Sequence, residues 1–271
     1  MYIIFSALYK IAHVLISLIF PFFFHKVAKA GCSAWKGIII DNALNQKRDA
    51  RTDVKGIHSR TIMDQSNISM VGSWKPEFDS YTKILFVRHP FDRVISAFYN
   101  LKHFKEGARM HGPGRHIRHE VKRMFDLESL AQLEFTDFVR FITNKSLEDP
   151  FYYDRHFNSF AQTCRVCDVK YDKILKIESM RHDSFPILKD MGFSDEYIDS
   201  MQKSDNTRPG VIPRSTLHSN KVLNELKHLN TKYYWMLLDR YKFDFQMFGY
   251  GINMHSNVAS CRIRMGNEEC C

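Results

Sequence analysis

The sequence lacks several features that would place it in a common class at once. No internal repeat or low-complexity linker divides its 271 residues, 44 % of which are apolar, so we expect one substantial core. The Walker A spacing G-x-x-x-x-G-K-[ST] is absent, which argues against an ATP or GTP hydrolase. No helix-turn-helix, zinc-finger or RNP pattern is present, which argues against a nucleic-acid-binding module.

A cysteine pattern typical of a structural metal site is also missing. Cys164 and Cys167 form a C-x-x-C, but no second pair follows at zinc-ribbon spacing, so we expect no metal. Three further cysteines lie in a terminal tail, where an oxidising compartment would allow cross-links: Cys261, Cys270 and Cys271.

What is present includes a segment typical of a strand, a tight turn and a helix, ILFVRHPFDRVISAFYN, residues 84–100. The run 83–87 is apolar after its first residue and favours an interior strand of a parallel sheet. Pro90 ends this run, and apolar residues then recur at helical spacing.

The charged residues at this turn have two interpretations. Arg88 and Arg93 can belong to a solvated turn, with an ion pair to Asp92 at the helix end. Alternatively the turn is an anion site, because ligands of open α/β sheets bind beyond the carboxyl ends of strands, where helix N-termini present free N–H groups. Arg88 would then add a bidentate donor and Ser96 a hydroxyl.

A second segment, FPFFFHKVAKAGCSAWKGIIIDNAL, residues 20–44, repeats the order of strand, small-residue loop and helix. Gly31 permits close backbone approach, and Ser33 can cap the helix or donate to a phosphate. Lys29 and Lys36 add positive charge. Two phosphate-binding turns predict a ligand with phosphate groups at two ends.

Four blocks in this order carry a family resemblance: KAGCSAWK, VRHPFDRVISAF, DRHFNSFAQTCRVCDVKYDKILKIES and YYWMLLDRYKFDFQMFGY. They resemble the Golgi carbohydrate sulfotransferases of the chondroitin 4-O-sulfotransferase and HNK-1 sulfotransferase type. The resemblance covers most of residues 22–250 and favours the anion-site interpretation of Arg88. It also favours a structural or disulfide role for Cys164 and Cys167.

The resemblance implies a P-loop-kinase-like α/β fold, with a central parallel sheet flanked by helices, and a donor, 3′-phosphoadenosine 5′-phosphosulfate. Lys29 matches the lysine at the 5′-phosphosulfate, and Arg88 with Ser96 matches the pair at the 3′-phosphate. Cys32 lies inside the first loop as a small packing residue. The donor-binding residues expected are therefore Lys29, Gly31, Cys32, Ser33, Lys36, Arg88 and Ser96.

Sulfuryl transfer is expected to be an in-line displacement that needs cationic stabilisation and no metal. Lys29 would stabilise the leaving phosphate, and a general base would take the proton of the acceptor hydroxyl. The first candidate for this base is His58, because related sulfotransferases place a base in the corresponding region; His89 and His156 follow. Any of them can instead be a surface or core histidine.

The charge balance bears on the acceptor. Lys and Arg number 39 against 30 Asp and Glu, and basic residues gather in 103–123, expected to be an exposed loop and then a helix. This stretch is either a solvated face or a groove for a polyanionic glycan. We expect transfer to position 4 of GalNAc in chondroitin. Alternatives are dermatan, a glucuronate-terminated glycan, a non-catalytic glycan-binding protein and a nucleic-acid-binding module, of which the last is the weakest.

The N-terminal residues 1–20 form a hydrophobic segment that could be a signal anchor of a single-pass Golgi protein with a lumenal catalytic domain. Residues 21–250 would be the sulfotransferase domain and 251–271 a tail. Because no stem separates the segment from the first strand, it could instead pack within the fold, end as an anchor near Leu18, or belong to a longer N-terminus. Sequons at Asn67 and Asn144 matter only in the secretory pathway.

The remaining pattern predicts a third strand over 171–178 and mostly helices elsewhere. Apolar residues in 127–142 recur in near-helical register, and 185–191 and 197–201 are typical of short helices. Residues 223–249 are expected to form one long closing helix whose aromatic residues lie in the core.

Overall fold

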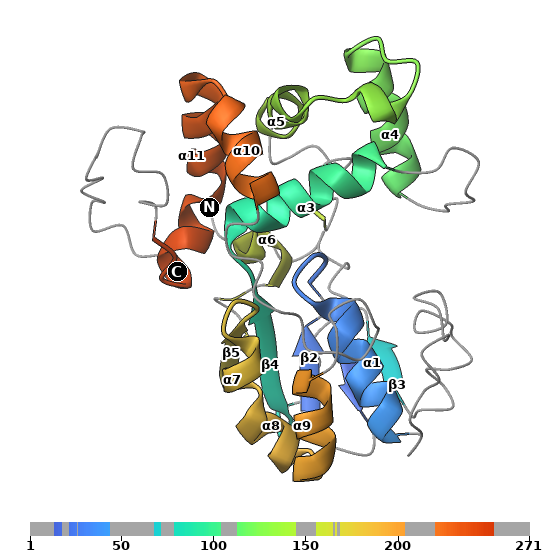
Figure 1. Cartoon of the computed structure of the whole chain (residues 1–271), viewed down its shortest axis with the longest axis vertical. Coiled ribbons are helices and arrows are strands. Elements are labelled where there is room, and N and C mark those ends of the chain that lie inside the picture. The colour runs from blue at the N-terminus through green and yellow to red at the C-terminus, as the bar shows by residue number, and fades with distance from the viewer. Residues whose placement is uncertain are drawn as a thin grey trace. The chain divides into compact units, whose positions relative to one another are not determined.

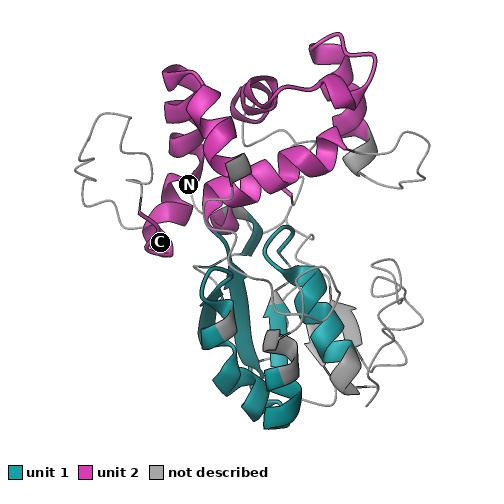
Figure 2. Ribbon diagram, in the orientation of Figure 1, with its two compact units in different colours: residues 1–88, 163–217 teal, residues 89–162, 218–271 magenta. Residues whose placement is uncertain are grey.

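The computed structural model describes residues 14–17, 22–25, 27–43, 68–71, 79–103, 113–144, 156–164, 166, 169–203 and 220–251. The chain divides into two compact units, residues 1–88 with 163–217 and residues 89–162 with 218–271 (Figure 2). Each unit is therefore assembled from two separate stretches of the chain.

The first unit is built on a sheet of order β3-β1-β2-β4-β5 among the described residues (Figure 1). Its strands are β1 (Val14–Ser17), β2 (Phe22–His25), β3 (Ile68–Val71), β4 (Thr82–Val87) and β5 (Lys173–Lys176). β2, β4 and β5 run parallel, with Phe22 opposite Thr82 and Ile84 opposite Lys173. The predicted parallel sheet is therefore confirmed, and all three predicted strands belong to it.

β1 pairs antiparallel with both β2 and β3, which adds two strands that the sequence did not indicate. Its residues, Val14–Ser17, come from the hydrophobic N-terminal segment, so this part of the segment packs in the sheet. No helix in the part of the chain that the structure describes is long and apolar enough to span a membrane.

Helices flank this sheet as predicted. They are α1 (Cys32–Ala43), α7 (Met180–Asp183), α8 (Phe185–Asp190) and α9 (Asp195–Lys203). Trp35 of α1 stacks on Phe86 of β4 with ring centroids 4.4 Å apart, and its Nε1 donates to the Met180 sulfur at 3.0 Å. A buried aromatic contact of this kind contributes about 0.5–1.5 kcal/mol to stability beyond the burial of apolar area. This contact holds the start of α1 against the strands.

The second unit is helical in its described residues. It contains α3 (Pro90–Lys102), α4 (Pro113–Met124), the 3-10 turn η3 (Leu130–Gln132), α5 (Phe135–Thr143), the start of α6 (Phe160–Cys164), α10 (Asn220–His228) and α11 (Thr231–Met247). Their apolar faces share one core, in which Phe98, Phe138 and Leu237 are buried. The helix expected after Pro90 and the helix within 103–123 are confirmed.

The prediction of one closing helix over 223–249 is wrong. α10 ends at His228 and α11 begins at Thr231, because Asn230 adopts a non-helical conformation with ψ 141°. Its side-chain oxygen accepts a hydrogen bond from the Lys232 N–H at 2.9 Å, as an N-cap residue does. The expected burial of aromatic residues in this region is confirmed for Tyr234, Tyr241 and Phe245.

Candidate functional site

The candidate site of the first unit lies at the carboxyl edge of the parallel strands. β2 and β4 are parallel neighbours, so the loop after His25 and the residues after Val87 emerge at the same edge. One guanidinium nitrogen of Arg88 donates to the main-chain oxygen of Lys29 at 3.2 Å. The two turns singled out in the sequence are therefore joined directly, although 59 positions separate these residues.

The loop between β2 and α1 has an unusual backbone. Lys29 and Gly31 both have positive φ, 67° and 71°. For a residue other than glycine this conformation is uncommon and costs about 1–2 kcal/mol, so its presence at Lys29 points to a functional constraint. The loop is closed by a hydrogen bond from the Ala30 N–H to the Val27 oxygen at 3.4 Å.

Gly31 is required for a second reason, a close approach to the loop that follows β5. A Cβ atom at this position would lie 2.5 Å from Cδ1 of Ile177. Ile177 is held there by its own N–H, which donates to the Val87 oxygen at 2.9 Å. Three strand ends thus meet at Gly31, and Glu178, which follows Ile177, adds an acidic side chain to this edge.

α1 begins at Cys32, immediately after this loop. Ser33 therefore lies in the first turn of α1 and is not its cap residue. The first turn contains no acidic residue, so nothing in it neutralises the positive end of the helix dipole. Lys36 is buried at 1 % exposure one turn later, and Cys32 is a half-buried free thiol.

Sequence reasoning missed the residues that shape this loop from outside it. Ile177 limits the space at Gly31, and the Met180 sulfur accepts from Trp35 of α1. Both follow β5, and the only sequence signal was the position of Ile177 at the end of a predicted strand.

The other predicted site residues lie elsewhere. Ser96 is half-buried on α3, in the second unit, whereas Arg88 is the last residue of the first stretch of the first unit. His58 lies outside the described residues. His89 is buried, with its ring edge-on to Phe245 at 5.2 Å between centroids, which is the environment of a core histidine. His156 is half-buried.

The solvated-turn interpretation is wrong for Arg93 and Asp92, which are 0 % and 2 % exposed. Arg93 donates to the main-chain oxygen of Asn158, and its guanidinium lies 4.7 Å from the centre of the Phe160 ring. Tyr241 donates to the oxygen of Phe157 in the same stretch. The charge of Arg93 thus serves to hold residues 157–160 inside the second unit.

Asp244 of α11 completes this buried arrangement. Its two carboxylate oxygens accept from the N–H groups of Phe160 at 2.9 Å and Ala161 at 3.2 Å, at the start of α6. Burial raises the pKa of Asp244 to about 6, against the opposing effect of these hydrogen bonds and of the nearby Arg93 and Arg240. Arg93, Tyr241 and Asp244 together fix residues 157–161 and are called the buried clamp below.

No group of three or more His, Cys, Asp or Glu side chains within the described ranges could hold a metal ion. Cys164 is a buried free thiol whose main-chain oxygen accepts from the Tyr171 hydroxyl at 2.8 Å, so it packs as a structural residue. Cys167 lies outside the described residues.

Comparison with known proteins identifies a family whose sequence model matches this chain. Residues 13–251 match the model of the "Sulfotransferase family". The match covers the loop at Lys29, the turn at Arg88, the buried clamp and all of β1.

Among curated proteins, the chain is similar to carbohydrate sulfotransferase 11 of Rattus norvegicus, with 25 % identity over 238 residues that cover 83 % of this chain and 63 % of the relative. It is 25 % identical over 237 residues to carbohydrate sulfotransferase 10 of Xenopus laevis, covering 84 % of this chain and 64 % of the relative. It is 26 % identical over 249 residues to carbohydrate sulfotransferase 14 of Danio rerio, covering 88 % and 62 %. The chain thus spans somewhat less than two thirds of the length of these relatives. No solved structure matches.

Proposed function

The chain belongs to the sulfotransferase family, and from this premise we propose that it transfers a sulfuryl group from 3′-phosphoadenosine 5′-phosphosulfate to a hydroxyl of a glycan. The acceptor we propose is position 4 of GalNAc in chondroitin. The names of the similar proteins, which are carbohydrate sulfotransferases, support a glycan as the acceptor class.

The observation that carries the proposal is the hydrogen bond from Arg88 to the Lys29 main-chain oxygen. It brings a lysine with a strained backbone and an arginine to one edge of a parallel sheet, beside the N-terminus of α1. A sulfated nucleotide with several anionic groups requires this combination of free N–H groups, lysine and guanidinium. Because Gly31 has no Cβ atom, the backbone of this loop can pack directly against the side chain of Ile177.

In the proposed reaction the acceptor oxygen forms a bond to sulfur while the bond from sulfur to the 5′-phosphate oxygen breaks. Lys29 stabilises the charge that develops on the leaving phosphate, with Gly31, Cys32, Ser33 and Lys36 around it. Arg88 and Ser96 hold the 3′-phosphate, which positions the donor for an in-line displacement.

The proton of the acceptor hydroxyl goes to His58, the proposed general base, and general-base catalysis of this kind contributes about 10²- to 10⁴-fold. No step requires a metal ion.

The test is sulfate transfer from radiolabelled donor to desulfated chondroitin, to dermatan and to a chain without free hydroxyls, using the full chain. Lys29→Ala should lower kcat by about 10²- to 10³-fold, because it removes one donor to the developing charge. Arg88→Ala should raise KM for the donor more than it lowers kcat. Lys170→Ala, an exposed lysine at the other end of β5, is the control and should behave as the parent chain.

The outcomes separate the alternatives. Transfer that depends on Lys29 and Arg88 supports the enzyme, and disaccharide analysis of the product then tests position 4 against other positions and acceptors. Donor binding without transfer to chondroitin would move the acceptor to dermatan or to a glucuronate-terminated glycan. If the chain shows no sulfate transfer and no donor binding, the enzyme is refuted. A non-catalytic protein that binds acidic glycans would then remain.

We also propose a Golgi membrane location with a lumenal catalytic domain, with the N-terminal segment up to β1 as the anchor, because Val14–Ser17 themselves pair within the sheet. Support comes from the sequence alone, through the apolar run in residues 1–20 and the sequons at Asn67 and Asn144. Expression in mammalian cells followed by glycosidase treatment tests this. A shift in mobility that Asn67→Gln and Asn144→Gln remove is expected, and an unglycosylated, soluble chain would contradict it.

A further inference from the structure

α4 carries a continuous basic face. Its apolar residues Ile117 and Val121 are buried in the core of the second unit, which fixes the orientation of the helix about its own axis. At 3.6 residues per turn, successive side chains are rotated by about 100°. Among the side chains that the structure describes, the side away from the core holds, in order around the helix, Arg118, Lys122, His119, Arg123 and His116.

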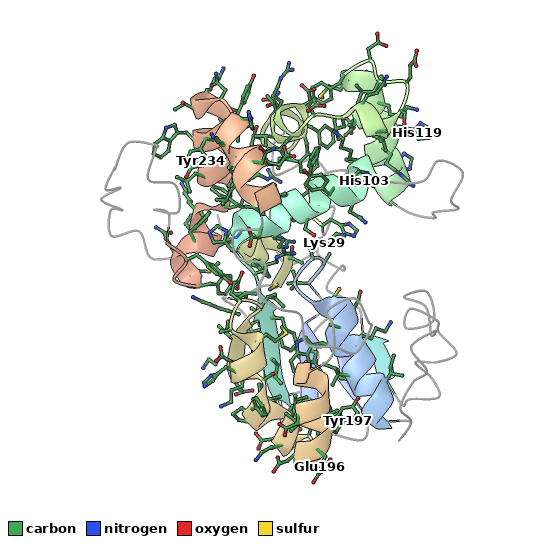
Figure 3. All side chains as sticks on the ribbon, in the orientation of Figure 1. Lys29, His103, His119, Glu196, Tyr197 and Tyr234 are labelled. Atoms are coloured by element: carbon green, nitrogen blue, oxygen red, sulfur yellow. The ribbon has the colours of Figure 1, made fainter. Side chains whose placement is uncertain are left out.

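These side chains lie at the surface. His116, His119 and Arg123 are exposed, and Arg118 and Lys122 are half-buried (Figure 3 labels His119). From His116 to Arg123 the helix rises about 10 Å. The single acidic residue of α4 is Glu120, at the border between this side and the apolar side.

Two other surface helices, α5 and α11, carry acidic and basic side chains that pair with each other. Arg140 pairs with Asp137 at 3.0 Å on α5, and Lys242 pairs with Asp239 at 3.4 Å on α11. On the outer side of α4, the side chains that the structure describes are five cationic or ionisable basic groups, and the one carboxylate of the helix lies beside them. A concentration of one sign of charge attracts polyions of the opposite sign over distances of about a Debye length, roughly 10 Å at 0.1 M salt.

We propose that this side of α4, the α4 basic face, docks the polyanionic chain of the acceptor glycan. This inference rests on the proposed function and deepens it, because it assigns acceptor recognition to particular residues. Arg118 and Arg123 would each bind a carboxylate or sulfate group bidentately, and Lys122 would act as a point charge. His116 and His119 would donate ring N–H groups to the same chain.

Two other polyanions fit the face less well. Single-stranded nucleic acid is bound through aromatic side chains on which bases stack, and α4 contains no Phe, Tyr or Trp. A membrane-bound amphipathic helix inserts its apolar side into the bilayer, but Ile117 and Val121 of α4 are already buried within the second unit. An acidic glycan requires only the charges and donors that are present.

The experiment compares two triple variants of the full chain that remove equal charge. The first is Arg118→Gln, Lys122→Gln and Arg123→Gln. The matched control is Lys170→Gln, Lys173→Gln and Lys227→Gln, which change exposed residues that are not part of α4. Thermal unfolding checks that both fold. If the first triple variant does not fold, the double variant His119→Gln with Arg123→Gln replaces it, because both of these positions are exposed.

Binding of fluorescently labelled chondroitin chains is measured as a function of salt. We expect the α4 variant to bind about tenfold more weakly at 0.1 M salt, and its affinity to fall less steeply with added salt, because fewer counterions are released. The control should bind as the parent chain. Equal weakening in both variants, or none in either, would overturn the proposal.

Sulfate transfer to a short oligosaccharide and to a long chondroitin chain separates this inference from the proposed function. The α4 variant should keep transfer to the short acceptor and lose the advantage of the long one. If the parent chain transfers sulfate to neither acceptor, the proposed function fails. The binding measurement then still tests whether the α4 basic face binds the glycan. Tighter binding of DNA of equal charge, or of anionic vesicles, through the same residues would overturn the glycan as the occupant.

Discussion

Gly31 meets two requirements at once, a positive φ of 71° and a close approach to Ile177. Alanine at this position would add both a conformational strain of about 1–2 kcal/mol and an overlap of its Cβ atom with Cδ1 of Ile177. We expect Gly31→Ala to lower the free energy of unfolding by about 2–4 kcal/mol and to weaken donor binding.

The double variant Gly31→Ala with Ile177→Val tests the cause. Valine lacks Cδ1, so it should recover the part of the loss that is due to overlap, and the two substitutions should be less destabilising together than the sum of their separate effects. Strictly additive losses in chemical denaturation would show that the Ile177 contact plays no part.

Asp244 of the buried clamp makes stability depend on pH. Burial raises its pKa to about 6 in the folded chain, above its ordinary value near 4. The stabilisation that the protonated group contributes is complete below about pH 4 and is lost as the pH rises through 6. Relative to Asp244→Asn, which cannot ionise, the parent chain should lose up to about 3 kcal/mol across this interval.

Thermal unfolding of both chains from pH 4 to pH 7 measures this difference. The curve of the parent chain minus that of the variant should fall with rising pH. A difference that rises with pH would mean that attraction to Arg93 and Arg240 outweighs the cost of burying the charge.

At the scale of elements, Asn230 determines where one helix ends and the next begins. Its side chain caps α11 through the Lys232 N–H, and replacement of such a cap by alanine costs about 1 kcal/mol. We expect Asn230→Ala to destabilise the second unit by this amount, as measured by chemical denaturation. Asn230→Asp keeps the acceptor oxygen and should stay within a few tenths of a kcal/mol of the parent; equal losses in both variants would argue against the cap.

The elements that could be predicted are those whose signal is local. β4 and α3 follow from an apolar run, Pro90 and helical spacing, and β2 with α1 follows from the same order of signals around Gly31. The break at Asn230 was missed because apolar residues continue in helical register on both sides of it.

What the sequence could not provide depends on distant partners. The burial of Arg93 requires Asn158 and Phe160, and that of Asp244 requires the N–H groups of α6. β1 was missed because four strand residues inside a long apolar run have the same composition as a membrane anchor. In the site, the local loop at Lys29 was predictable, whereas its bond to Arg88 and the limit set by Ile177 are tertiary contacts.

At the scale of the whole molecule, β1 lies between β3 and β2 and joins β3 to the rest of the sheet. It is the partner of both β2 and β3, so a chain that begins at residue 19 loses the strand that joins them. We expect the chain 19–271 to melt at a lower temperature than the chain 12–271, with faster hydrogen exchange at the amides of β3. Identical melting and exchange in the two chains would mean that β1 contributes nothing to stability.

The division of the chain also has a consequence for biosynthesis. The backbone passes between the two units after residues 88, 162 and 217, so each unit is interrupted by the other. β5, the parallel partner of β4, is translated only after the entire first stretch of the second unit. During that interval one edge of β4 lacks its strand, and an unpaired edge is the surface at which nascent chains associate wrongly. A chaperone that shields this edge until β5 emerges should therefore raise the yield of folded protein.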